Sequence, residues 1–478
     1  MRTLIHARYV IACRDGRHVL LENGDVVFEG DAIVYVGPSY PGGVDRRIDA
    51  PDRLLCPGFI SVHAHLASSS LTKSFLEDRG NPFHYMSGLY EALTLTDPTP
   101  DDGLLAARFA LVELVKSGVT TVVELGRLVP DGIVTLAGQL GVRAYVVPVY
   151  RSGRWHSPDG RRVVYEWRED QGLPDLASSV DFIRKHDGAW EGRIKSFLGP
   201  AQIDTCTPEL LRRTAALAEE LNVPVTIHAA QAVIEFQEIT RRHGKTPIEW
   251  LHEVGLLNRR LIIGHCIYVS GHPQVVFPNG RDLELLAASG ASVAHCPWVF
   301  GRRGVTMHSY ARYLKAGVNV ALGTDTFPHD MVREMRWAAV LAKVADGDPR
   351  VGTAADVFTS ATLGGARALH REDLGRITPG AKADLLLFRL DTLTMSPVRD
   401  PLKNLVFSGS RHDLDTVIVD GRTVMKGGRL EGIDESALAR ELQGAAERLW
   451  RGMPERDPAG RTVDQISTPS LPRWEDAG

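Results

Sequence analysis

The sequence predicts an α/β fold: a (β/α)8 TIM-type barrel joined to a small β-sandwich domain formed from both chain ends. Short apolar stretches alternate with amphipathic helical stretches across residues 57–370, and eight of the apolar stretches have the length of buried strands. Eight strand–helix repeats over roughly 300 residues are typical of such a barrel. Alternating strand patterns punctuated by Gly and Asp occur at both ends of the chain, which indicates one further β-rich domain.

The composition is that of an ordinary globular protein with more than one domain. The 478 residues are 44% hydrophobic, enough to build a large core. Acidic and basic side chains nearly cancel (59 against 55), which gives no sign of a nucleic-acid partner. No segment resembles a signal peptide or a membrane span, so we expect a cytoplasmic protein without a membrane partner. Five scattered cysteines fit neither a disulfide framework nor a Cys-x-x-Cys metal site.

The same patterns predict the domain boundaries. Residues 1–56 form the N-terminal part of the small β domain, and residues 371–430 form its C-terminal part. Residues 57–370 form the barrel, with an insertion at about 150–190 over the barrel mouth, because this stretch is longer than a βα loop requires. Residues 431–478 begin as a helix and end as a polar tail.

Metal-binding side chains stand at the ends of five of the eight predicted strands. Catalytic groups of such barrels lie at the carboxyl ends of the strands. Two histidines two residues apart end the first strand and therefore point to the same side. The last four members of the set are separated by 37, 30 and 30 positions, about one strand–helix unit each. The set is His63, His65, His228, His265, His295 and Asp325.

This set predicts a site for one divalent metal ion per chain. A single histidine at a strand end is more often a packed core residue, but five of them with a carboxylate favour a metal. Imidazole and carboxylate ligands suit Zn²⁺ best, with Fe²⁺, Mn²⁺ or Co²⁺ as alternatives. Such a metal lowers the pKa of a bound water. We expect Asp325 to accept the water's proton and His265 to orient the water, whereas His295 either contacts the site or is structural.

Three further residues are candidates by position. Glu124 ends the second predicted strand and either supplies an acid to the site or forms a salt bridge at the rim. Arg151 follows the third strand and either binds a substrate oxygen or lies at the surface under the insertion. Tyr90 belongs to an aromatic loop after the first strand, which either closes over the site or packs on itself.

Several motifs resemble those of the amidohydrolase superfamily. "PGFISVHAHL" is similar to the first-strand motif of that superfamily, and "GTDT" is similar to its last-strand motif. "FLGPAQIDTCTPELL" and "VAHCPW" resemble its ATZ/TRZ-like group, which includes triazine hydrolases and nucleobase deaminases. The resemblance covers nearly the whole chain and implies a mononuclear metal centre in a homo-oligomer, a dimer or a tetramer. It implies His63, His65, His228 and Asp325 as metal ligands, His265 in contact with the hydrolytic water, and Gln202 facing the substrate.

Two positions depart from that group. Its deaminases usually carry a proton-shuttling glutamate three residues after the fifth-strand histidine, where this chain has Gln231, an amide that cannot titrate. Polar residues that usually follow the seventh strand are replaced by Trp298, Val299 and Phe300. These changes favour a hydrolase that cleaves a carbonyl C–N or C–S bond in an amide-, urea- or (thio)carbamate-like small molecule with an apolar portion, similar to molinate and phenylurea hydrolases.

Two other functions stay open at this point. One is a deaminase or dechlorinase of a nitrogen heterocycle (a purine, pyrimidine or triazine), with Glu124 or His265 as the proton shuttle. The other is a binding protein that kept the barrel without catalysis, against which the complete set of metal ligands argues. A screen for ammonia or chloride release separates the first from carbonyl hydrolysis.

Overall fold

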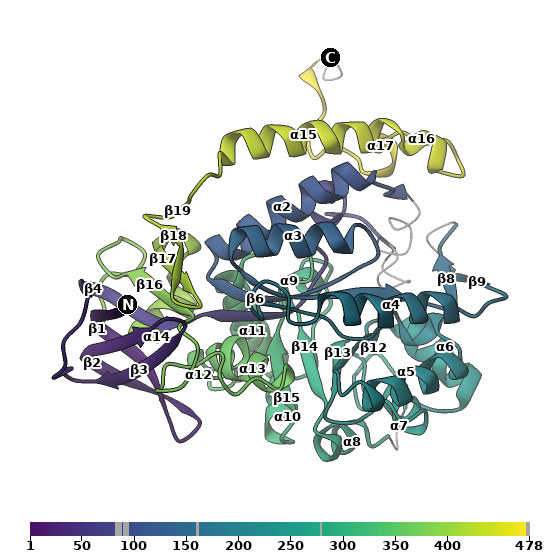
Figure 1. Cartoon of the computed structure of the whole chain (residues 1–478). Helices are drawn as coiled ribbons and strands as arrows, with labels where there is room; N and C mark the ends of the chain where they lie inside the picture. The colour runs from purple at the N-terminus through teal and green to yellow at the C-terminus, as the bar shows by residue number, and fades with distance from the viewer. Residues whose placement is uncertain (82–87, 89–94, 159–161, 278–279, 475–478) are drawn as a thin grey trace.

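The computed structural model describes all of the chain except residues 82–87, 89–94, 159–161, 278–279 and 475–478 (Figure 1). Tyr90, and with it most of the predicted aromatic loop, lies outside the described residues. Within the described part, every helix is too short or too polar to cross a bilayer. All five cysteines are buried and free, as their scattered positions predict.

Strands from both ends of the chain share one sheet of eight strands. They are β1 (Arg2–Arg14), β2 (Arg17–Glu29), β3 (Ala32–Gly37), β4 (Arg46–Pro57), β16 (Leu385–Arg389), β17 (Leu414–Val419), β18 (Arg422–Lys426) and β19 (Arg429–Leu430). Their order is β19-β18-β17-β16-β4-β1-β2-β3, so the join between the two chain ends is the antiparallel pair β16 and β4. Figure 1 shows the purple N-terminal strands beside the yellow-green C-terminal strands.

The predicted strands of the middle region lie in two parallel sheets. They are β5 (Phe59–Ala64), β6 (Val119–Gly126), β7 (Arg143–Tyr150), β10 (Ile194–Lys195), β11 (Gly199–Pro200), β12 (Val225–Ala229), β13 (Leu261–His265), β14 (Ser292–His295) and β15 (Asn319–Leu322). One sheet runs β10-β7-β6-β5 with β11 also on β7, and the other runs β12-β13-β14-β15. Isolated parallel bridges join Leu198 to Val225 and Ala64 to Asp325, so each sheet meets the other at both edges.

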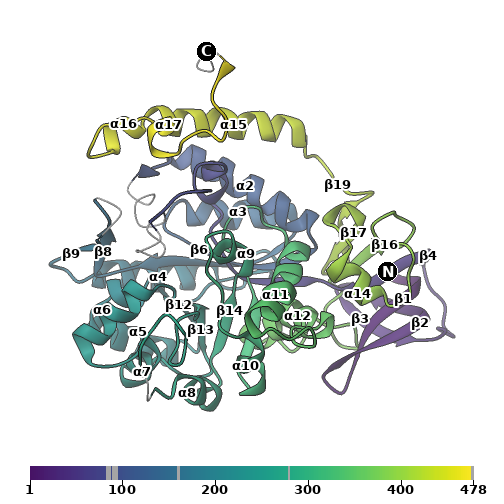
Figure 2. The same cartoon turned by 180° about the vertical axis from the view of Figure 1, so that it is seen from behind.

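Helices lie outside the parallel strands in both views (Figure 1 and Figure 2). Several begin at a Thr-Pro pair, where the threonine hydroxyl accepts a backbone N–H of the first turn, as at Thr99, Thr207 and Thr246. The helices of the middle region are α2 (Pro100–Lys116), α3 (Pro130–Leu140), α4 (Leu173–His186), α5 (Pro208–Glu220), α6 (Val233–His243), α7 (Pro247–Glu253), α8 (Asp282–Ser289), α9 (Pro297–Gly301), α10 (Tyr310–Lys315), α11 (Met331–Asp346), α12 (Ala354–Thr359) and α13 (Gly365–Ala368). Short turns of other helix types are η1 (Ser69–Thr72), η2 (Ile203–Thr205), η3 (Ser360–Gly364) and η4 (Arg411–Asp413).

The predicted insertion and C-terminal helix are both present as local structure. The segment after β7 contains an antiparallel hairpin, β8 (Gly153–His156) and β9 (Val164–Trp167), before α4 begins. Near the C-terminus, Leu442, Ala446 and Leu449 pack with Leu71 and Ala106 of the middle region. The remaining helices are α14 (Pro401–Phe407), α15 (Glu435–Arg451), α16 (Met453–Arg456) and α17 (Val463–Ile466).

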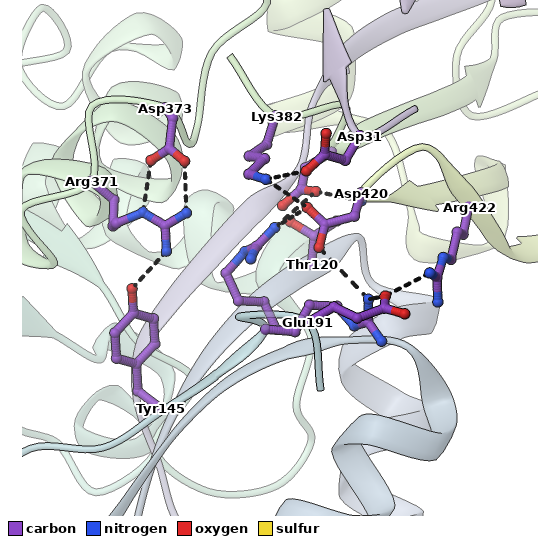
Figure 3. Close-up of polar contacts among 12 residues, drawn as sticks. Asp31, Thr120, Tyr145, Glu191, Arg371, Asp373, Lys382, Asp420 and Arg422 are labelled. Carbon is purple, nitrogen blue, oxygen red and sulfur yellow. Dashed lines mark hydrogen bonds and ion pairs between the residues drawn. The ribbon is translucent and has the colours of Figure 1, made fainter. Parts of the chain in front are cut away.

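A buried ion cluster links the sheet of end strands to the parallel strands (Figure 3). Arg143, at the start of β7, lies 2.5 Å from Asp420 and 3.5 Å from Asp384, on the two strands of the C-terminal half of that sheet. Arg193 adds a contact of 3.9 Å to Asp420. Because these groups are removed from water, each ion depends on its partners, and loss of one is costly.

Candidate active site and metal centre

The parallel strands bring the predicted ligands together. His63 lies in β5, His228 in β12 and His265 at the end of β13, while His65 and Asp325 immediately follow strands. Carboxyl ends of parallel strands meet at one face, so these side chains gather there. Two groups result, each with its ligand atoms within 4.8 Å of one another: His63, His65 and His228, and His63, His265 and Asp325.

Backbone carbonyl groups fix two of the imidazoles. His65 Nδ1 lies 2.6 Å from the carbonyl oxygen of Leu125, and His228 Nδ1 lies 2.6 Å from that of Ala201. A carbonyl only accepts, so each Nδ1 carries the proton and each Nε2 presents a lone pair. These two Nε2 atoms lie 3.2 Å apart. Two lone pairs at that distance repel, and a cation between them removes the repulsion.

Asp325 completes a set of atoms that one ion can contact. Its Oδ1 lies 3.4 Å from His65 Nε2 and 3.8 Å from His63 Nε2. Both nitrogens of His63 are buried without a hydrogen-bond partner. Ligands bound at about 2.1 Å are at most about 4.2 Å apart, and all of these separations meet that limit. The residues present therefore fit a divalent metal ion.

Burial keeps the imidazoles in the form that binds metals. It lowers the pKa of His63 and of His265 well below the usual histidine value, aided by the neighbouring imidazoles. Burial and the nearby His65 lower the pKa of His228 to about 3. Burial also raises the pKa of Asp325 against the opposing effect of His65. At neutral pH the imidazoles are thus neutral, as metal coordination requires.

Two glycines make room for the most buried ligand. A Cβ on Gly264 would lie 2.9 Å from the ring of His63, and one on Gly323 would lie 2.7 Å from the His63 Cβ. His63 has no exposed surface, so its ring has nowhere to shift. The glycines in "IIGH" and "ALGTD" are therefore part of the site.

The backbone is strained where the strands deliver their ligands. Ala230, His265 and Asp325 have φ angles of 55°, 78° and 52°, in the left-handed region that L-residues avoid. Such conformations persist only where the surroundings enforce them, and they cluster at functional sites. Here they turn the chain sharply at the ends of strands that carry ligands.

A cavity of about 190 Å³ opens beside the ligands. His65, His228, His265 and Asp325 line it together with Gln202 and Gln231, which the sequence predicts as substrate contacts. Phe300 also lines it and stacks edge-on against His265 with the ring centres 4.5 Å apart. The predicted contacts Gln202, Gln231 and Phe300 therefore share one cavity with the metal-binding groups.

Four other candidate residues face elsewhere. Trp298 packs against Trp337 of α11, 5.2 Å between ring centres, and does not line the cavity. His295 lies 5.8 Å from the ring of Tyr310, and burial lowers its pKa to about 4. The remaining two, Glu124 and Arg151, are also absent from the cavity lining.

Glu124 is buried beside the site rather than paired at the rim. Its Oε2 accepts the backbone N–H of Leu66 at 2.7 Å, one residue beyond His65. Its Oε1 is buried without a partner, and burial raises the pKa of the carboxyl group to about 8. The carboxyl group thus supports the turn after β5.

Sequence patterns did not reveal a second buried acid, Glu235. Its carboxyl oxygens accept the backbone N–H groups of Ala230 (2.5 Å) and Gln231 (3.2 Å). Glu235 is fully buried, and burial raises its pKa well above the usual value. It therefore fixes the turn that presents Gln231 to the cavity. The only sequence signal is an acid in the first turn of α6, which is common at helix starts.

Two further polar groups line the cavity without a sequence prediction. Ser69 contacts the buried His329 at 3.1 Å, and His329 Nδ1 contacts Thr324 at 2.9 Å, beside Asp325. Arg303 lines the cavity from the turn after α9. A serine and an arginine in loops have no periodicity that separates them from surface residues.

Comparison with known proteins identifies the family. The amidohydrolase family model matches residues 54–424. The chain belongs to the amidohydrolase family. A 5-methylthioadenosine/S-adenosylhomocysteine deaminase of Desulforudis audaxviator is 34% identical over 458 residues, covering 94% of this chain and 99% of the relative.

Two solved structures of the amidohydrolase fold superpose on most of the chain. An adenosine deaminase from Xanthomonas campestris with bound zinc has a TM-score of 0.81 at 26% identity, covering 94% of this chain and 98% of its own. Atrazine chlorohydrolase from Arthrobacter aurescens, complexed with zinc, has a TM-score of 0.78 at 24% identity, covering 93% and 100%. The second likeness shows the shared fold alone.

These findings confirm the resemblance to the amidohydrolase superfamily, with relatives of the ATZ/TRZ type. They also confirm the predicted enzyme class, an amidohydrolase that acts on carbon–nitrogen bonds other than peptide bonds. The similarity to molinate and phenylurea hydrolases stays a prediction. Between the two predicted reactions, the relatives favour the heterocycle deaminase over carbonyl hydrolysis.

Proposed function

We propose that this amidohydrolase removes the amino group from a nitrogen heterocycle of the adenine nucleoside class. One observation carries the proposal: neutral imidazoles and a carboxylate that fit a metal ion open into the same cavity as the amides Gln202 and Gln231. Amide groups can donate to and accept from the edge of a heterocycle. This replaces carbonyl hydrolysis as the preferred reaction and takes up the alternative that the sequence left open.

The relatives support the choice of ring chemistry. The Desulforudis protein is named for deamination of two adenine nucleosides, and it is similar to this chain over almost its full length. The Xanthomonas structure is an adenosine deaminase. Similarity over both the barrel region and the end strands favours a shared reaction type, while the substrate depends on the cavity.

The proposed ligands are His63, His65, His228 and Asp325, and zinc is the proposed metal. Zinc is bound in the two related structures described above. When bound, a divalent ion polarises water and lowers its pKa toward neutrality. The imidazole lone pairs and the carboxylate provide the mixed N and O ligand set that this ion accepts.

Protons are moved in this proposal by His265 and Asp325. His265 Nε2 lies 3.9 Å from Asp325 Oδ2, so both groups reach the same small volume of the cavity. Water oxygen adds to the ring carbon that carries the amino group, and Asp325 accepts the water's proton. The carbon–nitrogen bond then breaks, and the amino group takes that proton and leaves as ammonia.

Gln231 sets the part of the reaction that differs from the related deaminases. Its backbone is held by Glu235, so the amide side chain is presented to the cavity. An amide hydrogen-bonds a ring nitrogen but cannot protonate it. We therefore expect Gln231→Glu to increase deamination, because it adds a titrating group at the substrate.

Ammonia release tests the proposed function. Protein treated with a chelator and reloaded with zinc is incubated with adenosine, 5-methylthioadenosine and other aminated purines, pyrimidines and triazines. We expect release from at least one adenine nucleoside and its loss in His63→Ala. His252→Ala, which changes an exposed histidine on α7, is the matched control and should keep activity. No ammonia from any of these compounds contradicts the proposal.

Carbonyl hydrolysis remains the second candidate because of specific residues. Gln231 cannot supply the ring proton, and Val299 and Phe300 give the cavity an apolar wall. Both features suit an amide, urea or (thio)carbamate with an apolar portion. Amine or thiol release from N-aryl ureas and thiocarbamates, without ammonia release from heterocycles, would select this candidate.

We also infer the architecture that the sequence predicts. The two parallel sheets are treated as arcs of one closed (β/α)8 barrel over residues 57–370, since bridges join them at both edges. Residues 1–56 and 371–430 are assigned to the small β domain because their strands share a sheet. Residues 431–478 are assigned as the C-terminal helix and tail. The homo-oligomer and the cytoplasmic location stay predictions.

A further inference from the structure

The turn after α9 presents one arginine to the cavity and a second to protein groups. Val299, Phe300 and Arg303 all line the cavity, which matches their spacing of three and four residues on one helical face. Arg302 points away from that face. Its guanidinium contacts Glu77 at 2.7 Å and Thr326 Oγ1 at 3.2 Å.

Arg303 has no partner of this kind. Within the described part of the chain, no carboxylate, carbonyl or hydroxyl group hydrogen-bonds its guanidinium, although its neighbour Arg302 has several. The side chain is only partly exposed, and it faces the cavity. A guanidinium has five donors that require acceptors when water is displaced. A ligand that fills the cavity without an acceptor there would leave them unsatisfied.

The charge of the cavity points in the same direction. Among the described residues of the lining, Arg303 is the one permanently cationic side chain and Asp325 the one carboxylate. Asp325 is already assigned to the metal site. Burial and the adjacent Arg302 lower the pKa of Arg303 to about 10, so it stays charged at neutral pH. An uncompensated positive charge thus lies in a cavity with an apolar wall.

We propose that Arg303 is a specificity-determining residue that binds a carboxylate carried by the substrate. Its planar fork matches the two oxygens of a carboxylate, whereas the metal site and the amides hold the heterocycle. The substrate class is therefore an adenine-type nucleoside with a carboxylate on its sugar-side substituent. This inference rests on the proposed function for the heterocycle, and Arg303 supplies the choice among such compounds.

Matched probe pairs with and without the charge test the inference. Adenosine-5′-carboxylate is compared with adenosine-5′-carboxamide, and S-adenosylhomocysteine with 5-methylthioadenosine. Zinc-loaded protein is titrated with each probe by calorimetry, and ammonia release is followed separately. We expect Arg303→Gln to weaken binding of a carboxylate probe by about 10- to 100-fold, and binding of its neutral partner by less than about threefold. Arg303→Lys keeps the charge without the fork, and its loss should be intermediate.

The control removes a guanidinium that lies close in sequence but outside the cavity. Arg333→Gln alters an exposed arginine that covers the far-facing ring of Trp298, and it should leave all four affinities unchanged. The inference is overturned if the wild-type protein binds each carboxylate probe no better than its neutral partner, including the case in which it binds neither. Equal weakening of both partners by Arg303→Gln overturns it as well.

The two proposals fail in different ways. Absence of ammonia with retained, Arg303-dependent binding of a carboxylate probe contradicts the deaminase but supports the anion contact. Ammonia release that is equally efficient for charged and neutral probes, and equally affected by Arg303→Gln, supports the deaminase and contradicts the anion contact.

Discussion

Zinc should stabilise the folded protein through the ligand set, and His63→Ala should remove most of that effect. In the structure both nitrogens of His63 are buried and unpartnered, and the Nε2 atoms of His65 and His228 face each other at 3.2 Å. A cation that contacts these atoms binds the folded chain, while an unfolded chain does not hold them together. Binding to the folded state alone raises the free energy of unfolding by mass action.

The magnitude follows from the length of the chain. Free zinc at 100 times its dissociation constant adds about 2.7 kcal/mol to the free energy of unfolding. An unfolding entropy of about 2.1 cal/mol/K per residue gives about 1 kcal/mol/K for 478 residues. The expected increase in Tm is therefore about 3 °C. Each further tenfold increase in zinc adds about 1.4 kcal/mol, or about 1.4 °C.

Differential scanning calorimetry across a zinc titration of chelator-treated protein measures this effect. His63→Ala and Asp325→Asn should lose the zinc-dependent increase, and His252→Ala should retain it, because His252 is exposed on α7. Each variant is compared with itself without zinc, so a change in its basal Tm does not affect the result. An equal increase in wild type and His63→Ala would refute the assigned metal site.

Three other expectations follow. Burial raises the pKa of Glu124 to about 8 from an ordinary 4.5, so the folded state holds a proton that the unfolded state releases. Stability should therefore fall, by up to about 1.4 kcal/mol per pH unit, as pH rises from about 4.5 to 8; Glu124→Gln should flatten this slope in urea titrations at several pH values. Phe300→Ala should cost about 3–5 kcal/mol in the same urea assay, because it removes a buried ring packed on His265. Arg143→Met should cost about 3–5 kcal/mol by leaving Asp384 and Asp420 buried without their cation, and adding Asp420→Asn should restore part of the loss; no recovery would contradict this account of the cluster.

Much of the fold could be read from periodicity. All eight apolar stretches of the middle region are strands of parallel sheets, because a strand buried on both faces is continuously apolar. The fourth is split into β10 and β11, two residues each, which a run of apolar letters does not reveal. The pairing of β16 with β4 could not be derived from local pattern, since it joins residues more than 300 positions apart.

The metal-binding residues were predictable because their position in the repeat encodes their position in space. A histidine at the end of each of several parallel strands has to approach the others. Glu235 and Arg303 carry no such encoding. Their importance depends on which backbone groups and which cavity they reach, and both are set by the course of a turn. Trp298 was misplaced for the same reason, because it turns toward Trp337 and leaves Phe300 to line the cavity.

This difference separates the residues that decide chemistry from those that decide the substrate. The metal-binding groups stand on strands whose carbonyl contacts and neighbouring glycines leave little freedom, as at His63 beside Gly264 and Gly323. Val299, Phe300 and Arg303 stand on a five-residue helix and the turn after it. Substitution in that segment can change the charge and the width of the cavity without moving a ligand. The seventh strand-end loop, and Arg303 above all, is therefore where the substrate of this amidohydrolase is chosen.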